Sequence, residues 1–280
     1  MNKVSLPHYD LNMTLLGGQS FAWDFEDGFY WGCTKDKVIK LKIVRALHAM
    51  PLLYWQTYPE NDDFEFVKSY LRLDVNYQKI IKKIQKDNYI KSAIKKYPNL
   101  RLLKQDFEET LLSFLVSANN NIKSIRKIIR SMNRKFGRFV TVDGRKIFLF
   151  PKTEVIADAK IEDLLECKLG FRAKYLKGAA KHLIEKDLSK KIGKMAEADA
   201  RNSLLEINGV GEKISDCVLV FGLGFDNVTP LDVWEKRAFT KFYKLNPKMK
   251  YEEMQMWAGN YFEGYAGWAG QFLYEYVRNL

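Results

Sequence analysis

A chain of 280 residues with 47% hydrophobic and 14% aromatic residues can bury a large core, which excludes a disordered protein. Its formal net charge of +12 favours an anionic partner, nucleic acid first and a membrane surface second, with a merely soluble basic protein as the alternative. No apolar run approaches the roughly 20 residues that span a bilayer, and the N-terminus lacks the apolar segment of a signal peptide. We therefore expect an intracellular protein without a membrane partner.

The three cysteines, Cys33, Cys167 and Cys217, lie far apart in the sequence, so a disulfide scaffold is not expected. No cysteine follows Cys217, which excludes a four-cysteine iron–sulfur cluster near the C-terminus. The histidines are scattered without metal-ligand spacing. We predict no catalytic metal and no cofactor.

The N-terminal region, residues 9–58, has the alternation of apolar side chains that is typical of β-strands. Phe21, Trp23 and Phe25 recur at every second position, before a Glu-Asp-Gly turn. A further strand is expected over residues 52–58. Such strands with hairpin turns between them predict an antiparallel sheet.

Beyond this sheet the apolar period becomes helical. Residues 79–96 hold seven lysines and one acidic residue, which fits either a phosphate-attracting face or a solvated helix face. Strong helical stripes follow over residues 106–118 and 122–136. Asn119-Asn120-Asn121 lies between these helices, where capping of the second helix and contact with nucleic acid are alternative explanations.

The C-terminal half is predicted to be helical, after a small hairpin over residues 138–150 that turns at Asp143-Gly144. The predicted helices span residues 171–186, 231–243, 251–263 and 266–279. The fold class is therefore α+β, with an N-terminal antiparallel β-sheet domain followed by a mainly α-helical domain. We place the sheet domain and its trailing helices at residues 1–104 and the helical domain at residues 105–280.

Residues 202–237 carry the chemistry of the chain. A short helix leads into Gly209-Val210-Gly211, and a second helix begins at Glu212. Glycine has no Cβ, so the turn can approach a partner closely, and the free N–H groups that follow favour a phosphate. This helix-hairpin-helix motif, at about residues 202–222, predicts contact with a sugar-phosphate backbone.

Two side chains add reactivity to the hairpin. Lys213 occupies the first turn of the second helix, and Asp232 follows nineteen residues later, after Thr229-Pro230. A neutral lysine amine is a nucleophile, although an exposed surface lysine is the alternative. Burial and the helix dipole are expected to lower the pKa of Lys213 from its usual value of about 10.4. Asp232 could stabilise positive charge and help to activate Lys213, or cap the next helix, or do both.

Several motifs occur in an order that points to one family. They are Gly18-Gln19-Ser20-Phe21, Arg101-Leu102-Leu103-Lys104-Gln105-Asp106, Asn119-Asn120-Asn121, Leu169-Gly170-Phe171-Arg172-Ala173, Gly209-Val210-Gly211-x-Lys213 with Pro230-x-Asp232-Val233, and Tyr265-Ala266-Gly267-Trp268-Ala269. Together they resemble the 8-oxoguanine DNA glycosylase/AP lyase family of the helix-hairpin-helix–GPD superfamily. The resemblance spans nearly the whole chain, and it implies that Lys213 and Asp232 are the catalytic pair.

The resemblance also implies a pocket for the flipped base. Gly18 matches the glycine whose carbonyl accepts a hydrogen bond from the N7–H of the oxidised purine, although Gly17-Gly18 could be only a turn. Cys217 and Tyr274 match the residues on the two faces of the base, where Cys217 could also be a core thiol. Gln271 adjoins the position that usually bonds the Watson–Crick edge of the base.

Other matching residues imply contact with the DNA duplex. Phe171 matches an aromatic wedge, Arg172 matches the arginine beside it, and Asn119, with Asn120 next to it, matches the residue that bonds the orphaned base. The hairpin Gly209-Val210-Gly211 would contact the backbone. The backbone carbonyls of Leu205, Ile207 and Val210 resemble a structural site for a monovalent cation.

The chain departs from the family's better-known branch at three positions. Ser124 stands where an arginine usually reads the opposite cytosine, and Trp234 stands where a phosphate-contacting histidine is usual. Gly270 stands where a glutamine usually bonds the base. These departures predict altered partner-base preference and pocket detail, but unchanged lysine chemistry.

The expected function is DNA repair by a monomer that acts on double-stranded DNA containing oxidised guanine. Base flipping and Schiff-base attack at C1′ would release 8-oxoguanine, and β-elimination would cleave the abasic strand. One alternative is a glycosylase of the same superfamily for another damaged purine, and a second is a non-catalytic DNA-binding protein. Lys213 together with Asp232 argues against both alternatives.

Overall fold

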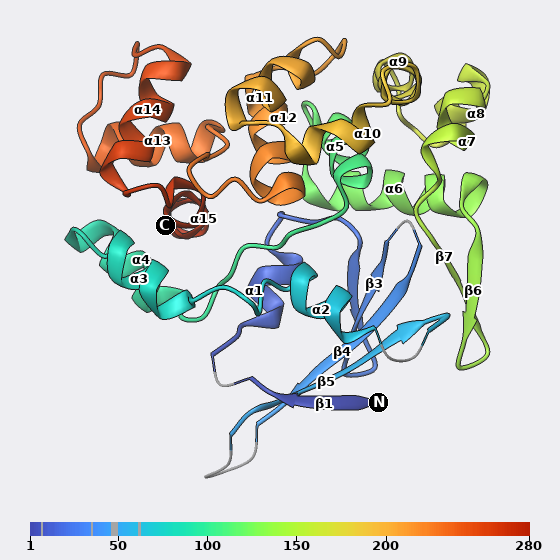
Figure 1. Cartoon of the computed structure of the whole chain (residues 1–280), viewed down its shortest axis with the longest axis horizontal. Helices are drawn as coiled ribbons and strands as arrows, with labels where there is room; N and C mark the ends of the chain where they lie inside the picture. The colour runs from blue at the N-terminus through green and yellow to red at the C-terminus, as the bar shows by residue number, and fades with distance from the viewer. Residues whose placement is uncertain (7, 35, 46–49, 61–62) are drawn as a thin grey trace.

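Five strands form an antiparallel N-terminal sheet in the computed structural model, which describes residues 1–6, 8–34, 36–45, 50–60 and 63–280 (Figure 1). The strand order is β1-β5-β4-β3-β2. The strands are β1 Asn2–Ser5, β2 Trp23–Glu26, β3 Phe29–Cys33, β4 Val38–Val44 and β5 Leu52–Tyr58. The predicted antiparallel sheet, including its strand at residues 52–58, is confirmed.

Helix α1, Leu11–Leu16, corrects the expectation that residues 9–58 form only strands. The Asp10 side chain accepts a hydrogen bond from the Met13 amide at 3.0 Å and so caps this helix. Leu11 and Leu15 lie one helical turn apart and are both buried in the sheet core. A helix of six residues is too short for its apolar period to stand out between strands.

The sheet core lies between the sheet and helices α1 and α2, the latter spanning Phe64–Tyr70. Trp23 and Trp55 are buried in it, and Trp23 Nε1 donates to Tyr70 Oη at 2.9 Å. A separate hairpin of β6, Phe139–Val142, and β7, Arg145–Phe148, turns at Asp143-Gly144 as predicted.

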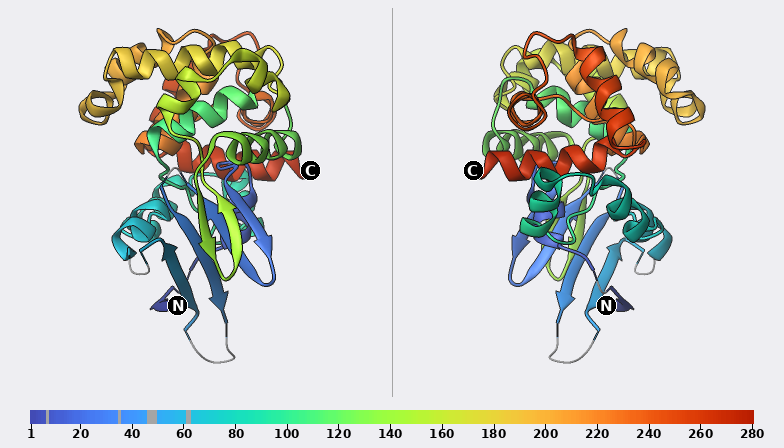
Figure 2. Two further views of the ribbon diagram at one scale, coloured as in Figure 1. Left: turned by 90° about the vertical axis from the view of Figure 1, so that its right-hand side faces the viewer. Right: turned by 90° about the vertical axis from the view of Figure 1, so that its left-hand side faces the viewer.

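The remaining helices form the larger body of the molecule (Figures 1 and 2). They are α3 Tyr77–Ile84, α4 Asn88–Lys96, α5 Phe107–Ser117, α6 Ile122–Phe136, α7 Thr153–Asp158, α8 Ile161–Glu166, α9 Arg172–Glu185, α10 Leu188–Lys191, α11 Glu197–Leu205, α12 Glu212–Val218, α13 Val233–Phe242, α14 Tyr251–Tyr261 and α15 Ala266–Arg278. A 3₁₀ turn spans Ile192–Lys194, and a π-helical turn spans Leu219–Leu223. The α+β class with a helical second part is confirmed.

Helices α3 and α4, which carry most of the lysine run, pack on the helical body. Ile84 and Ile90 belong to its core, whereas Leu103 belongs to the sheet core. Lys86 pairs with Glu263 at 2.6 Å, and Lys96 Nζ donates to the Asn279 carbonyl at 3.0 Å. Both lysines therefore make contacts within the protein. The predicted domain boundary after residue 104 stays a prediction.

Helix α15 runs along the junction between the helical body and the sheet (Figure 2). Two arginines cross this junction to the turn after α1. Arg126 Nη2 of α6 donates to the Leu16 carbonyl at 3.2 Å, and Arg278 Nη1 of α15 donates to the Gly17 carbonyl at 3.5 Å. The Gly17-Gly18 turn is thus fixed against the helical body. Within the described ranges, no helix is long and apolar enough to cross a membrane.

Candidate active site

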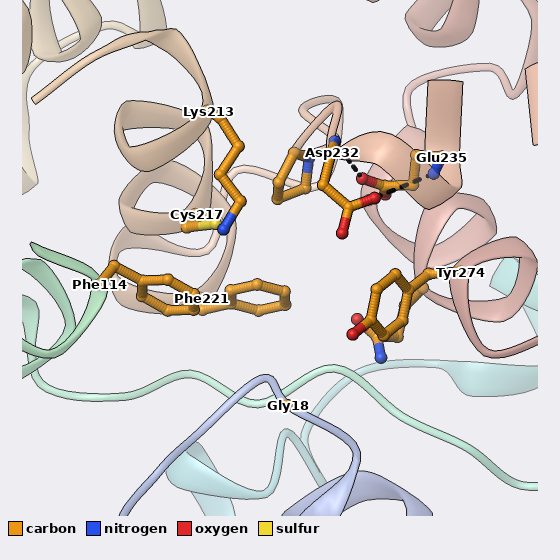
Figure 3. A pocket seen from close by; sticks show the side chains of 11 residues that line it. Gly18, Phe114, Lys213, Cys217, Phe221, Asp232, Glu235 and Tyr274 are labelled. Atoms are coloured by element: carbon orange, nitrogen blue, oxygen red, sulfur yellow. Dashed lines mark hydrogen bonds between the residues drawn. The ribbon is translucent and has the colours of Figure 1, made fainter. Parts of the chain in front are cut away.

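A pocket forms where the Gly18 turn faces α12, α13 and α15 (Figure 3). Its lining consists of Gly18, Phe114, Lys213, Cys217, Phe221, Pro230, Asp232, Glu235, Gly267, Gln271 and Tyr274. All six residues predicted for catalysis and base recognition are among them. The pocket adjoins a hollow that is lined in part by Asn120, Asn121, Trp234 and Arg278.

Lys213 reaches the pocket because α12 begins one residue before it, after Gly211 in the N-cap position. Figure 3 shows its side chain extending along the helix toward Cys217, one turn further on. The Nζ atom lies 5.2 Å from the ring centre of Phe114. The exposed-lysine alternative is therefore wrong, because the amine points into an apolar part of the pocket.

The pKa of Lys213 lies above its ordinary value, which corrects the expected lowering. Burial does lower this pKa, but the neighbouring Cys217 and Asp232 raise it by more. The Cys217 thiol is buried too, and burial raises its pKa to about 12. With its pKa raised, the lysine is an ammonium ion near neutral pH, so it must lose a proton before it can attack.

Asp232 is the N-cap of α13, as one of its predicted roles requires. Its Oδ1 accepts hydrogen bonds from the amides of Trp234 at 2.8 Å and Glu235 at 3.0 Å. Glu235 Oε2 in turn accepts from the Asp232 amide at 3.2 Å, which completes a capping box. These bonds hold one carboxylate oxygen, and Figure 3 shows the carboxylate directed into the pocket.

Glu235 is a pocket residue that the sequence interpretation missed. It is buried, and its Oε1 accepts from Thr229 Oγ1 at 2.7 Å. Burial and then the charge of Asp232 raise the pKa of Glu235 well above its ordinary value. The spacing Asp232-x-x-Glu235 was the available signal, since it is the capping-box pattern.

Gly270 makes room for this carboxyl group. A Cβ on Gly270 would overlap the Thr229 hydroxyl and would lie 2.7 Å from Glu235 Oε1. The departure at residue 270 is therefore coupled to Thr229 and Glu235. The glutamine that the family usually carries at residue 270 would not fit this arrangement.

The base-recognition side of the pocket comes from Gly18 and α15. Gly18 has φ +107°, and a Cβ there would meet Ile122 Cδ1 at 2.9 Å. Tyr274 Oη accepts from Arg278 Nη1 at 3.0 Å. Gln271 is 7% exposed, and its Nε2 has no hydrogen-bond partner among the described residues. A donor without a partner in a pocket lining is available to a ligand.

The predicted duplex-contacting residues lie together beside the adjoining hollow. Arg172 Nε donates to the Ala118 carbonyl at 2.7 Å, and its Nη2 donates to the Asn119 carbonyl at 3.0 Å. Phe171 is 53% exposed, and the centre of its ring lies 4.6 Å from Cζ of Arg172. Asn121 caps α6 by accepting from the Ser124 amide at 2.9 Å. Capping thus accounts for Asn121. Asn120 Oδ1 accepts from the Asn121 amide at 2.9 Å, and Asn119 has φ +50°, which asparagine tolerates better than most residues.

The hairpin glycines have distinct structural reasons. Gly209 has φ +94°, and a Cβ there would lie 2.8 Å from the Tyr175 ring. Gly211 precedes α12 and leaves open space around it. The Ile207 carbonyl, one of the three proposed cation ligands, accepts from the Val210 amide at 2.9 Å, and the cation site stays a prediction. Among the described residues, no group of His, Cys, Asp and Glu could hold a metal ion.

Two family models match consecutive parts of the chain. Residues 3–111 match the 8-oxoguanine DNA glycosylase N-terminal domain, and residues 112–259 match the HhH-GPD superfamily base excision DNA repair protein. A Saccharomyces cerevisiae protein named N-glycosylase/DNA lyase is 29% identical over 254 residues, covering 83% of this chain and 68% of the relative.

Solved structures agree with these matches. One described as MBOgg1 in complex with a low affinity DNA ligand is 32% identical, with a TM-score of 0.89, covering 99% of this chain and 95% of that one. Another is the Clostridium acetobutylicum 8-oxoguanine glycosylase/lyase in complex with double-stranded DNA containing cytosine opposite 8-oxoguanine. It is 28% identical, with a TM-score of 0.86, and the match covers 97% of this chain and 92% of that chain. The chain belongs to the HhH-GPD superfamily of base excision DNA repair proteins and, within it, to the 8-oxoguanine DNA glycosylase family.

Proposed function

We propose that the protein removes 8-oxoguanine from double-stranded DNA and then cleaves the abasic strand. The observation that carries this proposal is the meeting of Lys213 and Asp232 with Gly18 and Tyr274 in one pocket. A half-buried lysine amine facing a carboxylate suits attack on a sugar, and the opposite wall suits a flipped purine. The names of the similar proteins support the same reaction.

The reaction begins with extrusion of the damaged nucleotide into the pocket. Lys213 loses a proton, and its amine forms a bond with C1′ while the bond from C1′ to the base breaks. The departing base takes up a proton, and Asp232 stabilises the positive charge that develops on the sugar. The C1′–O4′ bond then breaks, O4′ takes up a proton, and the nitrogen of Lys213 becomes doubly bonded to C1′. This Schiff base allows loss of a proton from C2′ and departure of the 3′ phosphate, which is β-elimination.

Base recognition is assigned to the wall opposite Lys213. The Gly18 carbonyl would accept the N7–H of 8-oxoguanine, Gln271 Nε2 would donate to an acceptor on the base, and Tyr274 and Cys217 would cover its faces. Phe171 would fill the gap in the duplex, and Asn119 and Asn120 would contact the orphaned base. Arg172 supports this loop through the Ala118 and Asn119 carbonyls.

The proposal further holds that the enzyme is a monomer, that it needs no cofactor and that it works on intracellular DNA. A glycosylase for another purine would have less use for the buried lysine, and a DNA-binding module would need neither Lys213 nor Asp232. The structural cation at the carbonyls of Leu205, Ile207 and Val210 belongs to the same proposal.

Borohydride trapping tests the reaction directly. We expect the wild-type protein to form a covalent adduct with a duplex that contains one 8-oxoguanine, and to release the free base. An undamaged duplex of the same sequence is the control. Release of an alkylated purine instead would support the second glycosylase class, and binding without an adduct or base release would support the DNA-binding module.

A further inference from the structure

A buried polar cluster lies next to the pocket, where α12 meets α11 and α14. Asp216, three residues after Lys213 on α12, is fully buried. Its Oδ1 forms an ion pair with Arg201 of α11. Its Oδ2 accepts hydrogen bonds from Tyr251 Oη at 2.5 Å and from Gln255 Nε2, both on α14. One carboxylate thus joins three helices.

The same two α14 side chains hold the loop that leads to Asp232. Gln255 accepts from the Thr229 amide at 3.3 Å and donates to the Thr229 carbonyl. Tyr251 Oη accepts from the Leu231 amide at 3.2 Å. Pro230, between these residues, has no N–H to offer. The backbone on both sides of Pro230 is therefore bonded to the side chains that bind Asp216.

Lys213 and Asp232 have no direct bond that could set their separation. Among the described residues, no ion pair or hydrogen bond joins them, and the π-helical turn at Leu219–Leu223 interrupts the chain between them. An error of about 1 Å in the placement of reacting groups can lower a rate about 10²-fold. Some other contact must therefore fix the lysine relative to the aspartate.

We infer that Asp216 is a positioning residue that fixes Lys213 relative to Asp232 through Tyr251 and Gln255. The inference rests on the proposed function, because it assigns a purpose to this geometry only if Lys213 and Asp232 react with DNA. Asp216 moves with Lys213, since both belong to α12, and Leu231 moves with Asp232, since they are adjacent. Tyr251 Oη bonds to both Asp216 and the Leu231 amide, and Gln255 Nε2 bonds to both Asp216 and the Thr229 carbonyl.

A purely stabilising role is the competing explanation. Removal of one partner from a buried ion pair commonly costs about 3–5 kcal/mol, so substitution of Asp216 or Arg201 would confound stability with rate. Tyr251 offers a gentler change, because Tyr251→Phe removes one hydroxyl and leaves the Asp216–Arg201 pair in place. The test should therefore compare rates per folded molecule in this variant.

Tyr261→Phe is the matched control. Tyr261 lies on the same helix, and its hydroxyl also donates to an aspartate, Asp87, at 3.0 Å. In the part of the chain that the structure describes, that pair has no hydrogen bond to residues 229–232. Both substitutions remove one tyrosine-to-aspartate hydrogen bond, but only Tyr251→Phe removes one of the two side-chain links between α12 and the Asp232 loop, the other being Gln255.

The experiment measures single-turnover strand cleavage on a preformed abasic duplex and base release from an 8-oxoguanine duplex. For Tyr251→Phe we expect the maximal rate of both reactions to fall about 10- to 100-fold, as for misplaced reacting groups. The enzyme concentration for half-maximal rate should stay unchanged, since the DNA-contacting surface is intact. Tyr261→Phe should match the wild type within about twofold.

Gln255→Met is a second variant, to be judged in the same way if Tyr251→Phe does not fold. Wild-type maximal rates in the folded variant, or equal losses in the Tyr251 and Tyr261 variants, would overturn the inference. Cleavage of abasic DNA by the wild type without release of 8-oxoguanine would overturn the proposed lesion and leave the Tyr251 comparison valid. A wild type with no trappable adduct on either duplex would overturn both proposals.

Discussion

The two walls of the pocket are built in different ways. Lys213 and Asp232 come from one continuous stretch of the chain. The opposite wall brings together Gly18 and Tyr274, which lie near the two ends of the sequence. The first wall is held by a helix start, a capping box and the Asp216 cluster. The second depends on contacts such as that between Arg278 and the Gly17 carbonyl. The reactive residues are therefore positioned mainly by contacts within one stretch of the sequence, whereas the lesion-recognition residues are positioned by contacts between distant parts of the sequence.

Loss of the nucleophile should have the largest effect. We expect Lys213→Gln to abolish base release, strand cleavage and borohydride trapping, because glutamine cannot form a Schiff base. Binding to an 8-oxoguanine duplex should persist, since the recognition wall is unchanged. Lys181→Gln, an exposed change on α9, is the charge-matched control and should keep wild-type rates. Undiminished trapping by Lys213→Gln would remove this residue from its role.

Replacement of Asp232 by asparagine should have the next largest effect. The asparagine side-chain oxygen can still cap α13, but the negative charge is lost, so we expect the single-turnover rate to fall about 10²-fold or more. Asp232→Ala should reduce the rate similarly and should also lower the free energy of unfolding by about 1 kcal/mol, because the cap is lost. Thermal unfolding of the two variants separates the cap from the charge. Equal rates for wild type and Asp232→Asn would contradict the electrostatic role.

A change in the recognition wall should separate the two activities. Gly18→Ala places a Cβ on a residue with φ +107°, 2.9 Å from Ile122 Cδ1, so the turn must shift. We expect release of 8-oxoguanine to fall about tenfold or more, as for a loss of about 1–3 kcal/mol. Cleavage of a preformed abasic site should change less, because Lys213 is untouched. Parallel loss of both activities would show that the walls are not independent.

The partner base should have a smaller effect. Ser124 is too short to read a cytosine as an arginine would, and loss of such a contact removes about 1–3 kcal/mol of discrimination. The Arg126 guanidinium donates to the Leu16 carbonyl at 3.2 Å, so it is engaged within the protein and not placed to replace the missing arginine. The exposed Lys123, which lines the adjoining hollow, remains as a substitute.

We therefore expect measurable excision opposite C, A, G and T, with selectivity that is weakened but not lost. Single-turnover rates on four duplexes that differ only in the partner base would measure it. A strong preference for C would contradict the expectation. If that preference disappeared in Lys123→Ala, the substitute reader would be identified.

The smallest effect should be a pH-dependent change in stability at Glu275. Burial raises the pKa of Glu275 to about 7, against the lowering effect of Arg278. Between about pH 4.5 and pH 7, Glu275 is therefore protonated in the folded state and ionised in the unfolded state. Its contribution to the free energy of unfolding falls as pH rises through that window. Glu275→Gln has no such titration. The Tm difference between this variant and the wild type, variant minus wild type, should therefore increase by a few degrees from pH 5 to pH 8. In a protein of this size, 1 kcal/mol corresponds to roughly 2–4 °C in Tm. A constant difference would contradict the shifted pKa.

The same division of the pocket explains what could be predicted from the sequence. The hairpin, the cap at Asp232 and the helix over residues 122–136 depend on neighbours in the chain, and all three are confirmed. Helix α1 was missed because six residues carry little periodic signal. The expected sign of the Lys213 pKa shift was wrong because Cys217, one helical turn away, and Asp232, which tertiary packing brings near, together outweigh the effect of burial.

Long-range partners account for the other omissions. The sequence alone did not connect Gly270 with Thr229 and Glu235, although a Cβ at residue 270 would displace them. The sequence also gave no sign that Arg172 supports the Asn119 loop, because Arg172 and Asn119 lie at the ends of two different helices. Roles of individual pocket residues in DNA recognition therefore stay predictions until the proposed variants are measured.

The contact between Arg278 and the Gly17 carbonyl joins residues that are 261 apart in the sequence. Closure of so long a loop is slow compared with formation of helices and short turns, so it belongs to the late part of folding. The helix-hairpin-helix segment and its lysine need no such closure. During refolding from denaturant, the ability to cut abasic DNA should therefore return before the ability to select the oxidised base.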